Sequence, residues 1–337
     1  MASVALSAPT RPPRSRRRRN LAPYWYLLPA FLVMAFITFY PLAFQVWMSF
    51  TDFAAVNFNQ RLHQAPNFVG LDNYLQIAQS KLAIPNFEFP RLVFFNLWWA
   101  LSNVVIHVVL GVAVAVILNA KGLWFKGIYR ALYILPVVIP QIIVATVWRN
   151  MFDTDAGAVN FLLQAIGGIF GIPADNPAFH LNWIGQVNDP ISFIPLPLAY
   201  FAMLAANVWL GWPLNSVVAT GALQSIPGEL YEAAEMDGAS PWQKFRNVTI
   251  PFLRPAMLPF AIYGFVVTFN LFFLPYFMTA GQPFGRTEIL VTQAYRLAYD
   301  QNLYGVAAAF CVYLFFLLLA VTLVTNRLAQ ATKSYAD

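Results

Sequence analysis

The chain has 337 residues, of which 59% are hydrophobic and only 10% are charged. Soluble domains carry about 25% charged residues, so this composition excludes an ordinary soluble protein and indicates a polytopic membrane protein. The net charge of +6 does not indicate a nucleic-acid partner, because six arginines lie within the first nineteen residues and account for the excess.

The basic stretch is followed by an apolar run from Leu21 to Phe50. This run is longer than the ~7–15 residues of a signal-peptide core, and no A-x-A cleavage site ends it. We therefore expect a basic cytoplasmic tail over residues 1–22 and a retained first span. The single cysteine, Cys311, can form no internal disulfide.

We predict an all-α membrane domain over residues 23–337, since a span needs about 20 apolar residues. The six expected transmembrane helices lie near 24–48, 93–118, 129–150, 195–222, 256–277 and 304–325. With both termini in the cytoplasm, fourteen of the twenty Lys and Arg lie inside: six in the tail, three at 121–130, three at 244–254 and two at 327–333. This distribution agrees with the positive-inside rule. A shorter apolar segment, 159–172, suits a surface helix better than a span.

The stretch 227–251 is polar although it lies between two apolar segments. We expect a helix that starts at Pro227 and ends at Gly238, because glycine accepts the left-handed conformation that a helix C-terminus needs. Ser240 and the glutamine three positions later form a capping box for a second helix. Pro251 and Pro255 are expected to end that helix. The predicted arrangement is helix, sharp turn, helix.

One spaced pattern in this stretch is informative: Glu232-Ala233-Ala234, three residues, Gly238, nine residues, then Val248-x-Ile250-Pro251. It resembles the EAA loop, EAA-x3-G-x9-I-x-L-P, of permease subunits of binding-protein-dependent ABC importers. The chain departs from that pattern only by two apolar exchanges. The resemblance implies a cytoplasmic coupling loop over 223–254 whose short helix docks on an ATP-hydrolysing subunit. The residues it assigns to this coupling are Glu232, Ala233, Ala234, Asp237 and Gly238.

A second stretch, F-x-G-L-x-N-Y at 68–74, resembles the sugar-importing branch of these permeases. By resemblance to maltose-type permeases, the mid-membrane sugar path corresponds to Trp209, Leu210, Gly211, Leu214, Gly264, Val267, Thr268 and Leu271. Asn215 and Asn270 are neighbouring polar candidates, because amides can bind sugar hydroxyls. Leu214, Val267 and Leu271 are apolar where that branch would lead us to expect polar or aromatic groups. The resemblance therefore leaves the sugar open.

No Asp, Glu, Lys or Arg lies in the central part of any expected span, which disfavours an ion-coupled carrier. The sequence contains no P-loop, its three histidines form no metal-binding pattern, and we find no catalytic arrangement. We therefore expect a non-catalytic subunit without a metal or cofactor of its own. ATP and Mg would be bound by the partner ATPase.

The sequence thus favours a permease subunit of a carbohydrate ABC importer in a bacterial or archaeal plasma membrane, with a di- or oligosaccharide as cargo. The partners expected from the resemblance are a second homologous permease, an ATPase dimer, an extracytoplasmic solute-binding protein and membrane lipid. Two alternatives stay open. The same machinery could carry glycerol phosphate or a polyol, or the chain could be an ion-coupled secondary transporter or a membrane enzyme.

Overall fold

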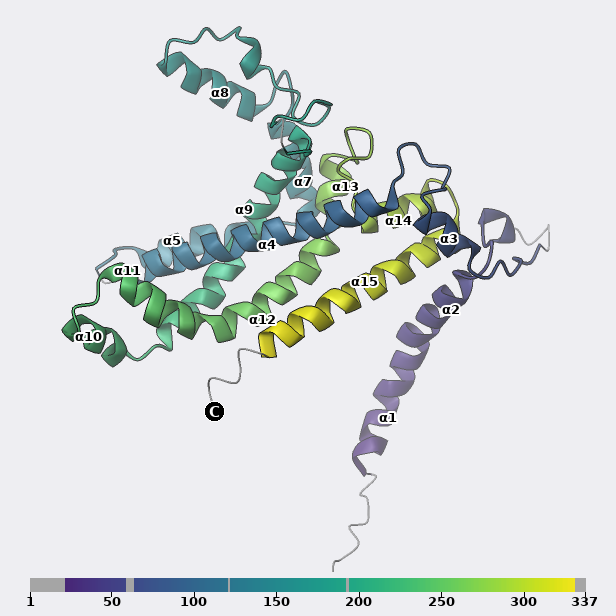
Figure 1. The fold of residues 1–337 in the computed structure, drawn as a ribbon, viewed down its shortest axis with the longest axis horizontal. Helices are drawn as coiled ribbons and strands as arrows, with labels where there is room; N and C mark the ends of the chain where they lie inside the picture. Colours follow the sequence, from purple (N-terminus) through teal and green to yellow (C-terminus); the bar gives the residue numbers. More distant parts are fainter. Residues whose placement is uncertain (1–21, 59–63, 121, 192–193, 331–337) are drawn as a thin grey trace, which may run out of the picture. The chain divides into compact units, whose positions relative to one another are not determined.

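The computed structural model describes residues 22–58, 64–120, 122–191 and 194–330 (Figure 1). These residues are helical throughout, apart from loops and one isolated antiparallel bridge between Thr51 and Phe68. Five of the described helices are long and apolar enough to cross a membrane, and one bent pair makes a sixth candidate. The predicted all-α membrane fold is confirmed. The chain divides into two units, Met1–Trp47 and Met48–Asp337, and each is described by itself.

The first unit contains all but the last residue of one candidate span, Trp25–Met48. It is built from α1 (Ala22–Met34), a π-helical turn (Ala35–Phe39) and α2 (Tyr40–Met48). Every side chain from Trp25 to Phe44 is exposed in the chain as it stands. A helix that is apolar on all sides needs lipid or protein around it, so this surface is suited to the membrane interior.

The second unit is organised around two long helices, α4 (Phe89–Asn119) and α9 (Leu198–Gln224). α12 (Ile250–Phe269) and α15 (Tyr304–Gln330) are the other long helices. The shorter helices are α3 (Asp72–Ala78), α5 (Lys126–Tyr133), α6 (Leu135–Val138), α7 (Gln141–Met151), α8 (Ala158–Ile169), α10 (Gly228–Met236), α11 (Pro241–Lys244), α13 (Phe273–Met278) and α14 (Leu290–Tyr299).

α4 and α9 pack closely because each presents a glycine to the other. A Cβ atom added to Gly111 of α4 would lie 2.5 Å from the Cβ of Asn215 on α9. In the opposite direction, a Cβ added to Gly211 of α9 would lie 2.1 Å from the His107 ring on α4. Small residues let membrane helices approach in this way.

Buried amides join these helices. The side chain of Asn207 donates to Oδ1 of Asn103 at 2.8 Å, and Asn103 donates to the carbonyl of Trp99 at 2.7 Å. Asn96 donates to the carbonyl of Phe269 at the end of α12, and its own oxygen accepts the backbone N–H of Leu290 at 2.7 Å. Such bonds contribute about 0.6 kcal/mol each between membrane helices. They hold α4, α9, α12 and the start of α14 in register.

The stretch predicted as a span at 129–150 is bent by 96° between Lys126–Val138 and Gln141–Met151. The break lies at Ile139, which precedes Pro140 and has extended backbone angles, φ −77° and ψ 129°. A residue before proline is disfavoured in the helical region, which explains the position of the break. α6 and α7 consequently run in different directions.

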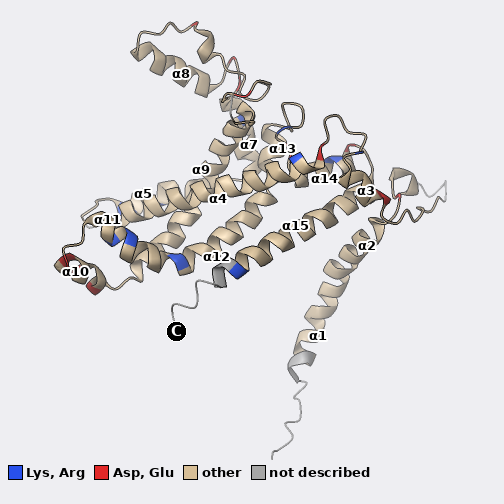
Figure 2. Ribbon diagram, in the orientation of Figure 1, with Lys and Arg blue, Asp and Glu red and all other residues tan. Residues whose placement is uncertain are grey.

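Charged residues lie at the ends of the long helices of the second unit (Figure 2). Arg91 is near the start of α4, Arg254 is near the start of α12, and Arg327 is in the last turn of α15. α9 contains no charged residue. Apart from Glu288 in the loop before α14, the buried polar side chains of the described residues are amides, hydroxyls and one imidazole.

Candidate functional site

A cavity of about 170 Å³ lies within the second unit between α4, α6, α9 and α12. Eight of the ten predicted path residues line it: Leu210, Gly211, Leu214, Asn215, Gly264, Val267, Thr268 and Leu271. The lining residues of α9 and of α12 recur at three- and four-residue spacing, so each of these two helices contributes one face, and α4 contributes His107. The structure thus brings together residues from two helices that are separated by about 50 positions in the sequence.

The polar groups of the cavity are all uncharged side chains. His107, Gln141, Asn207, Asn215 and Thr268 line it, and none of its lining residues is Asp, Glu, Lys or Arg. The ring Nε2 of His107 donates to the backbone carbonyl of Asn207 at 3.0 Å, and Asn215 donates to the carbonyl of Gly211 at 3.1 Å. Amides and hydroxyls can both donate and accept, so this wall suits a neutral polar ligand.

The cavity opens on a side of the chain that the described residues leave uncovered. Tyr263 is 60% exposed, and Leu214 and Val267 are each 42% exposed. These side chains line the cavity and also reach the surface. The described part of the chain therefore forms only part of an enclosure.

Two predicted path residues lie outside the lining. The Trp209 ring packs against Trp148 with centroids 6.1 Å apart, and the Asn270 side chain donates to the carbonyl of Val266. Trp209 is adjacent in sequence to Leu210, but successive residues of a helix point about 100° apart. Asn270 directly follows the last residue of α12.

Sequence reasoning missed eight lining residues, and four of them, Pro136, Val137, Ile139 and Gln141, belong to the bent segment, whose packing no local pattern predicts. The eight residues are His107, Pro136, Val137, Ile139, Gln141, Asn207, Phe260 and Tyr263. Asn207, Phe260 and Tyr263 could have been found by extending the three- and four-residue spacing backwards along each helix.

The second candidate site is the loop that contains α10. Glu232, Ala233, Asp237 and Gly238 are exposed, and Ala234 is half-buried. α10 begins at Gly228, with Pro227 as the residue just before it. The residues assigned to ATPase coupling therefore lie on a short, largely exposed helix and the turn that follows it.

The sharp turn after α10 has the predicted geometry. Gly238 has φ +75°, and Ser240 forms a capping box with Gln243 at the start of α11. Lys244 of α11 pairs with Glu235 of α10 at 2.5 Å. The turn and this ion pair fix α10 against the following helix.

The expectation that Pro251 and Pro255 end the second helix is wrong, since helix continues from Pro241 through both prolines to Phe269. A π-helical turn over Phe245–Thr249 precedes Pro251, and the Ile250 N–H donates to the carbonyl of Phe245. A proline ring clashes with the carbonyl four residues earlier, and a wider turn accommodates this clash. α1 and α2 are joined in the same way, with a π-helical turn just before Pro41.

The α10 loop rests on a buried apolar cluster at one end of the bundle. The cluster consists of Ala115, Ala219, Leu223, Ile226, Leu253 and Met257. Tyr231 of α10 and Val248 of the π-helical turn pack against it. Tyr231 is also within hydrogen-bonding distance of the Thr249 hydroxyl, at 3.0 Å. α10 thereby packs against a cluster built from residues of α4, α9 and α12, three of the helices that line the cavity.

The family described as "Binding-protein-dependent transport system inner membrane component" matches residues 107–333, a range that contains the α10 loop and all of the cavity lining. The chain belongs to this family. The resemblance inferred from the EAA pattern is thereby confirmed, and the family is one of membrane transport subunits rather than enzymes.

Known permeases of this family are similar over most of the chain. The galactooligosaccharides transport system permease protein GanP of Bacillus subtilis is 30% identical over 93% of this chain and 71% of its own length. The trehalose/maltose transport system permease protein MalF of Thermococcus litoralis is 32% identical over 76% of this chain and 78% of its own length.

A solved structure of a bacterial alginate ABC transporter, in complex with an alginate pentasaccharide-bound periplasmic protein, has a similar fold. Its matching chain has a TM-score of 0.70 and 21% identity, over 94% of this chain and 96% of that chain. The likeness supports the permease fold.

Proposed function

We propose that this permease is a transmembrane subunit of an ABC importer that moves a neutral sugar, a di- or oligosaccharide, into the cytoplasm. The observation that carries the proposal is the uncharged polar cavity between α4, α6, α9 and α12. The named relatives transport galactooligosaccharides and trehalose or maltose, which agrees with a cavity of this character. This cavity offers a phosphate ester no positively charged partner, since no lining residue is Lys or Arg.

We propose that α10 docks on a separate ATPase that binds ATP and Mg. Exposed Glu232 and Asp237 are available for basic groups, and Ala233 and Ala234 allow close approach. Closure of the ATPase would move α10 as a rigid body. Because Tyr231 packs on the cluster between α4, α9 and α12, this movement would be transmitted to the cavity walls.

The open side of the cavity suits a second, homologous permease, which would supply the remaining wall. An extracytoplasmic solute-binding protein would deliver the sugar to the opposite end of the bundle from α10. We assign both termini and the α10 loop to the cytoplasm of a bacterial or archaeal cell. The excess of Lys and Arg on that side supports this orientation.

The first experiment is to tag the chain, extract it in mild detergent and identify the proteins that co-purify. We expect a stoichiometric ATPase with a P-loop and a second permease, and ATPase activity that rises with the sugar-loaded binding protein. A chain that purifies alone under several mild conditions would contradict the proposal. It would shift the assignment to a transporter that works without an ATPase.

A further inference from the structure

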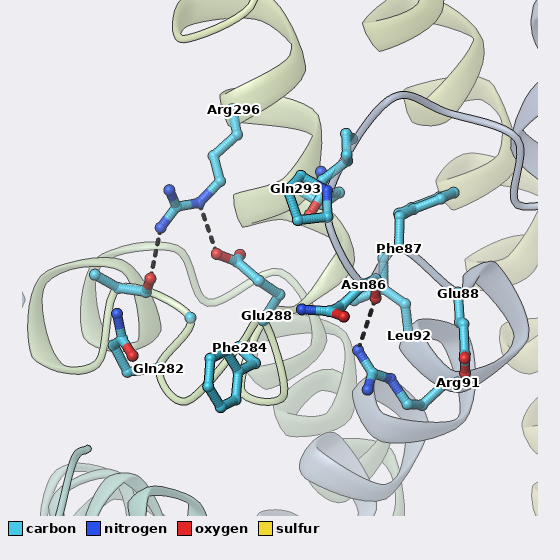
Figure 3. A pocket seen from close by; sticks show the side chains of 15 residues that line it. Asn86, Phe87, Glu88, Arg91, Leu92, Gln282, Phe284, Glu288, Gln293 and Arg296 are labelled. Atoms are coloured by element: carbon cyan, nitrogen blue, oxygen red, sulfur yellow. Dashed lines mark hydrogen bonds and ion pairs between the residues drawn. The ribbon is translucent and has the colours of Figure 1, made fainter. Parts of the chain in front are cut away.

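A second pocket, of about 280 Å³, lies at the end of the bundle opposite the α10 loop. One wall is the segment 84–92, which leads into α4, and the other is the loop 280–288 between α13 and α14. Figure 3 shows the Glu288 carboxylate directed toward Arg296 of α14, with the Asn86 side chain extending toward Glu288 from the other wall. It shares no lining residue with the central cavity.

The loop wall of this pocket is held in a defined shape. Arg296 pairs with Glu288 at 2.6 Å and donates to the carbonyl of Ala280 at 2.7 Å. Gly281 is necessary there, because an added Cβ would lie 2.2 Å from Oε1 of Glu288. Farther along the loop, Arg286 pairs with Asp189 at 2.6 Å. These contacts preform the wall before any ligand arrives.

The backbone around the pocket is unusually rich in left-handed conformations. Five lining residues have positive φ: Asn86, Ala280, Gly281, Phe284 and Gly285. The conformation is strained for Ala280 and Phe284, which carry side chains. Residues held in such conformations by their surroundings are concentrated at ligand sites.

The pocket contains a polar group that has no partner. Gln293 is 5% exposed, and its Nε2 has no hydrogen-bond partner among the residues that the structure describes. A buried amide N–H without an acceptor is unfavourable, so its position on the lining indicates that a ligand oxygen belongs there.

The charges of the pocket are balanced. Glu88 and Glu288 supply two carboxylates, and Arg91 and Arg296 supply two guanidinium groups. Neither an anion nor a cation is favoured, whereas hydroxyl groups can accept from the amide and guanidinium groups and donate to the carboxylates. Phe87 and Phe284 add aromatic surface on which the apolar face of a sugar ring can pack. The volume is just below the ~300–1,000 Å³ of pockets for drug-sized ligands, which suits a single ring.

We infer that this pocket binds one ring of a neutral saccharide, as a site separate from the central cavity. The choice of a saccharide among hydroxylated ligands rests on the proposed function. A ring held here would lie at the end of the bundle at which the sugar enters.

The test is a protection experiment on the complete transporter in lipid nanodiscs, where both faces are accessible. In a Cys311→Ala background, Gln282→Cys places a thiol on the pocket lining, and Gln76→Cys places an exposed control thiol on α3. The alkylation rate with a maleimide is measured against the concentration of glucose, galactose or maltotriose, with galacturonate as a charged comparison.

We expect at least one neutral sugar to slow alkylation at position 282 and not at position 76, with weaker protection by galacturonate. Gln293→Met should raise the half-protecting concentration by about fivefold, the effect of one lost hydrogen bond. It should not lower the melting temperature, because it removes a buried N–H group that has no acceptor among the described residues. Absence of protection by all three neutral sugars, or equal protection in Gln293→Met, would overturn the inference.

The central-cavity variant Thr268→Val separates this inference from the proposed function. It should impair uptake and retain protection at position 282. If the wild type imports sugar without protection at position 282, only the second site is refuted. If position 282 is protected but the complete transporter imports no sugar, the proposed function is refuted and the pocket remains a saccharide site.

Discussion

At the residue scale, Gly211 and Gly221 of α9 differ sharply in their surroundings. Gly211 lies against the His107 ring, while an added Cβ at Gly221 would have no heavy atom within 4 Å. The pair separates the effect of close packing from the effect of helix propensity, because both glycines belong to the same helix.

Gly211→Ala should destabilise the protein by about 1–3 kcal/mol, since the added methyl group overpacks the contact with His107. Gly221→Ala should be neutral or stabilising by up to about 1 kcal/mol, because alanine is the better helix former. Thermal unfolding of the purified variants in one detergent measures both. Equal melting temperatures would contradict the close packing of α4 and α9.

Glu288 makes stability depend on pH. Burial raises its pKa above the ordinary value of 4.5, against the opposing effects of the Thr292 hydrogen bond and Arg296. The folded state therefore holds a proton that the unfolded state releases. This contribution to stability is complete below pH 4.5 and is lost as pH rises through the elevated pKa.

Glu288→Gln should remove this pH dependence, because the amide cannot ionise. We expect the melting temperature of the wild type to fall more than that of Glu288→Gln between pH 4.5 and neutrality. The measurement is thermal unfolding across that range, with Asp300→Asn as a matched control for loss of a neighbouring carboxylate. If the melting temperatures of wild type and Glu288→Gln change in parallel with pH, Glu288 is not the source of the pH dependence.

At the element scale, the α10 loop joins an exposed helix to a long continuous one. The π-helical turn at Phe245–Thr249 allows the helix to pass Pro251 without interruption. Displacement of α10 would therefore act on one continuous helix, from Pro241 to Phe269, that extends to the wall of the cavity. The left-handed turn at Gly238 sets the direction of α10 relative to that helix.

Gly238→Val should uncouple ATP hydrolysis from sugar uptake while leaving membrane insertion intact. An added Cβ meets no atom within 4 Å, so the effect comes from forcing a branched residue into φ +75°, at about 1–2 kcal/mol. Gly228→Ala is the matched control, because its surroundings are also open and its φ is not positive. Uptake and sugar-stimulated ATPase activity are measured for both. Normal values in Gly238→Val would count against the proposed role of the loop.

Local chemistry was the part of this region that the sequence could predict. The left-handed turn at Gly238 and the capping box at Ser240 depend on a few adjacent residues, and both are present. The continuation of the helix past Pro251 depends on the π-helical turn at Phe245–Thr249, which no residue pattern predicts. The cavity wall at Ile139 depends on where a bent segment packs, which only the tertiary fold determines.

Within the predicted sugar path, spacing mattered more than residue type. Leu210 and Leu271 line the cavity although they are apolar, while Trp209 and Asn270 do not, although their chemistry suits a sugar. Trp209 lies one position away from the inward face of α9, and Asn270 directly follows the last residue of α12. Periodicity along α9 and α12 would have identified the face correctly.

At the scale of the whole molecule, the two ends of the bundle differ in function under the proposed orientation. Met236, 89% exposed, belongs to the α10 loop, and Phe284, 61% exposed, belongs to the loop at the opposite end. Cysteine substitutions at these two positions distinguish the orientations directly.

In intact cells carrying the Cys311→Ala background, an impermeant maleimide should label Phe284→Cys and leave Met236→Cys unlabelled. After the membrane is permeabilised, Met236→Cys should also react unless the ATPase covers it, and a denaturing step removes that protection. The reverse pattern in intact cells would invert the assigned topology.

The uncharged wall of the central cavity has an electrical consequence. A charge that crosses the full membrane field gains or loses about 2.3 kcal/mol per 100 mV. The cavity lining contains no Asp, Glu, Lys or Arg, so the groups that face the cargo carry no fixed charge through that field when the walls rearrange. With a neutral cargo, the transmembrane voltage does no work on this step. Uptake should then proceed at the same rate in polarised and depolarised vesicles at equal ATP.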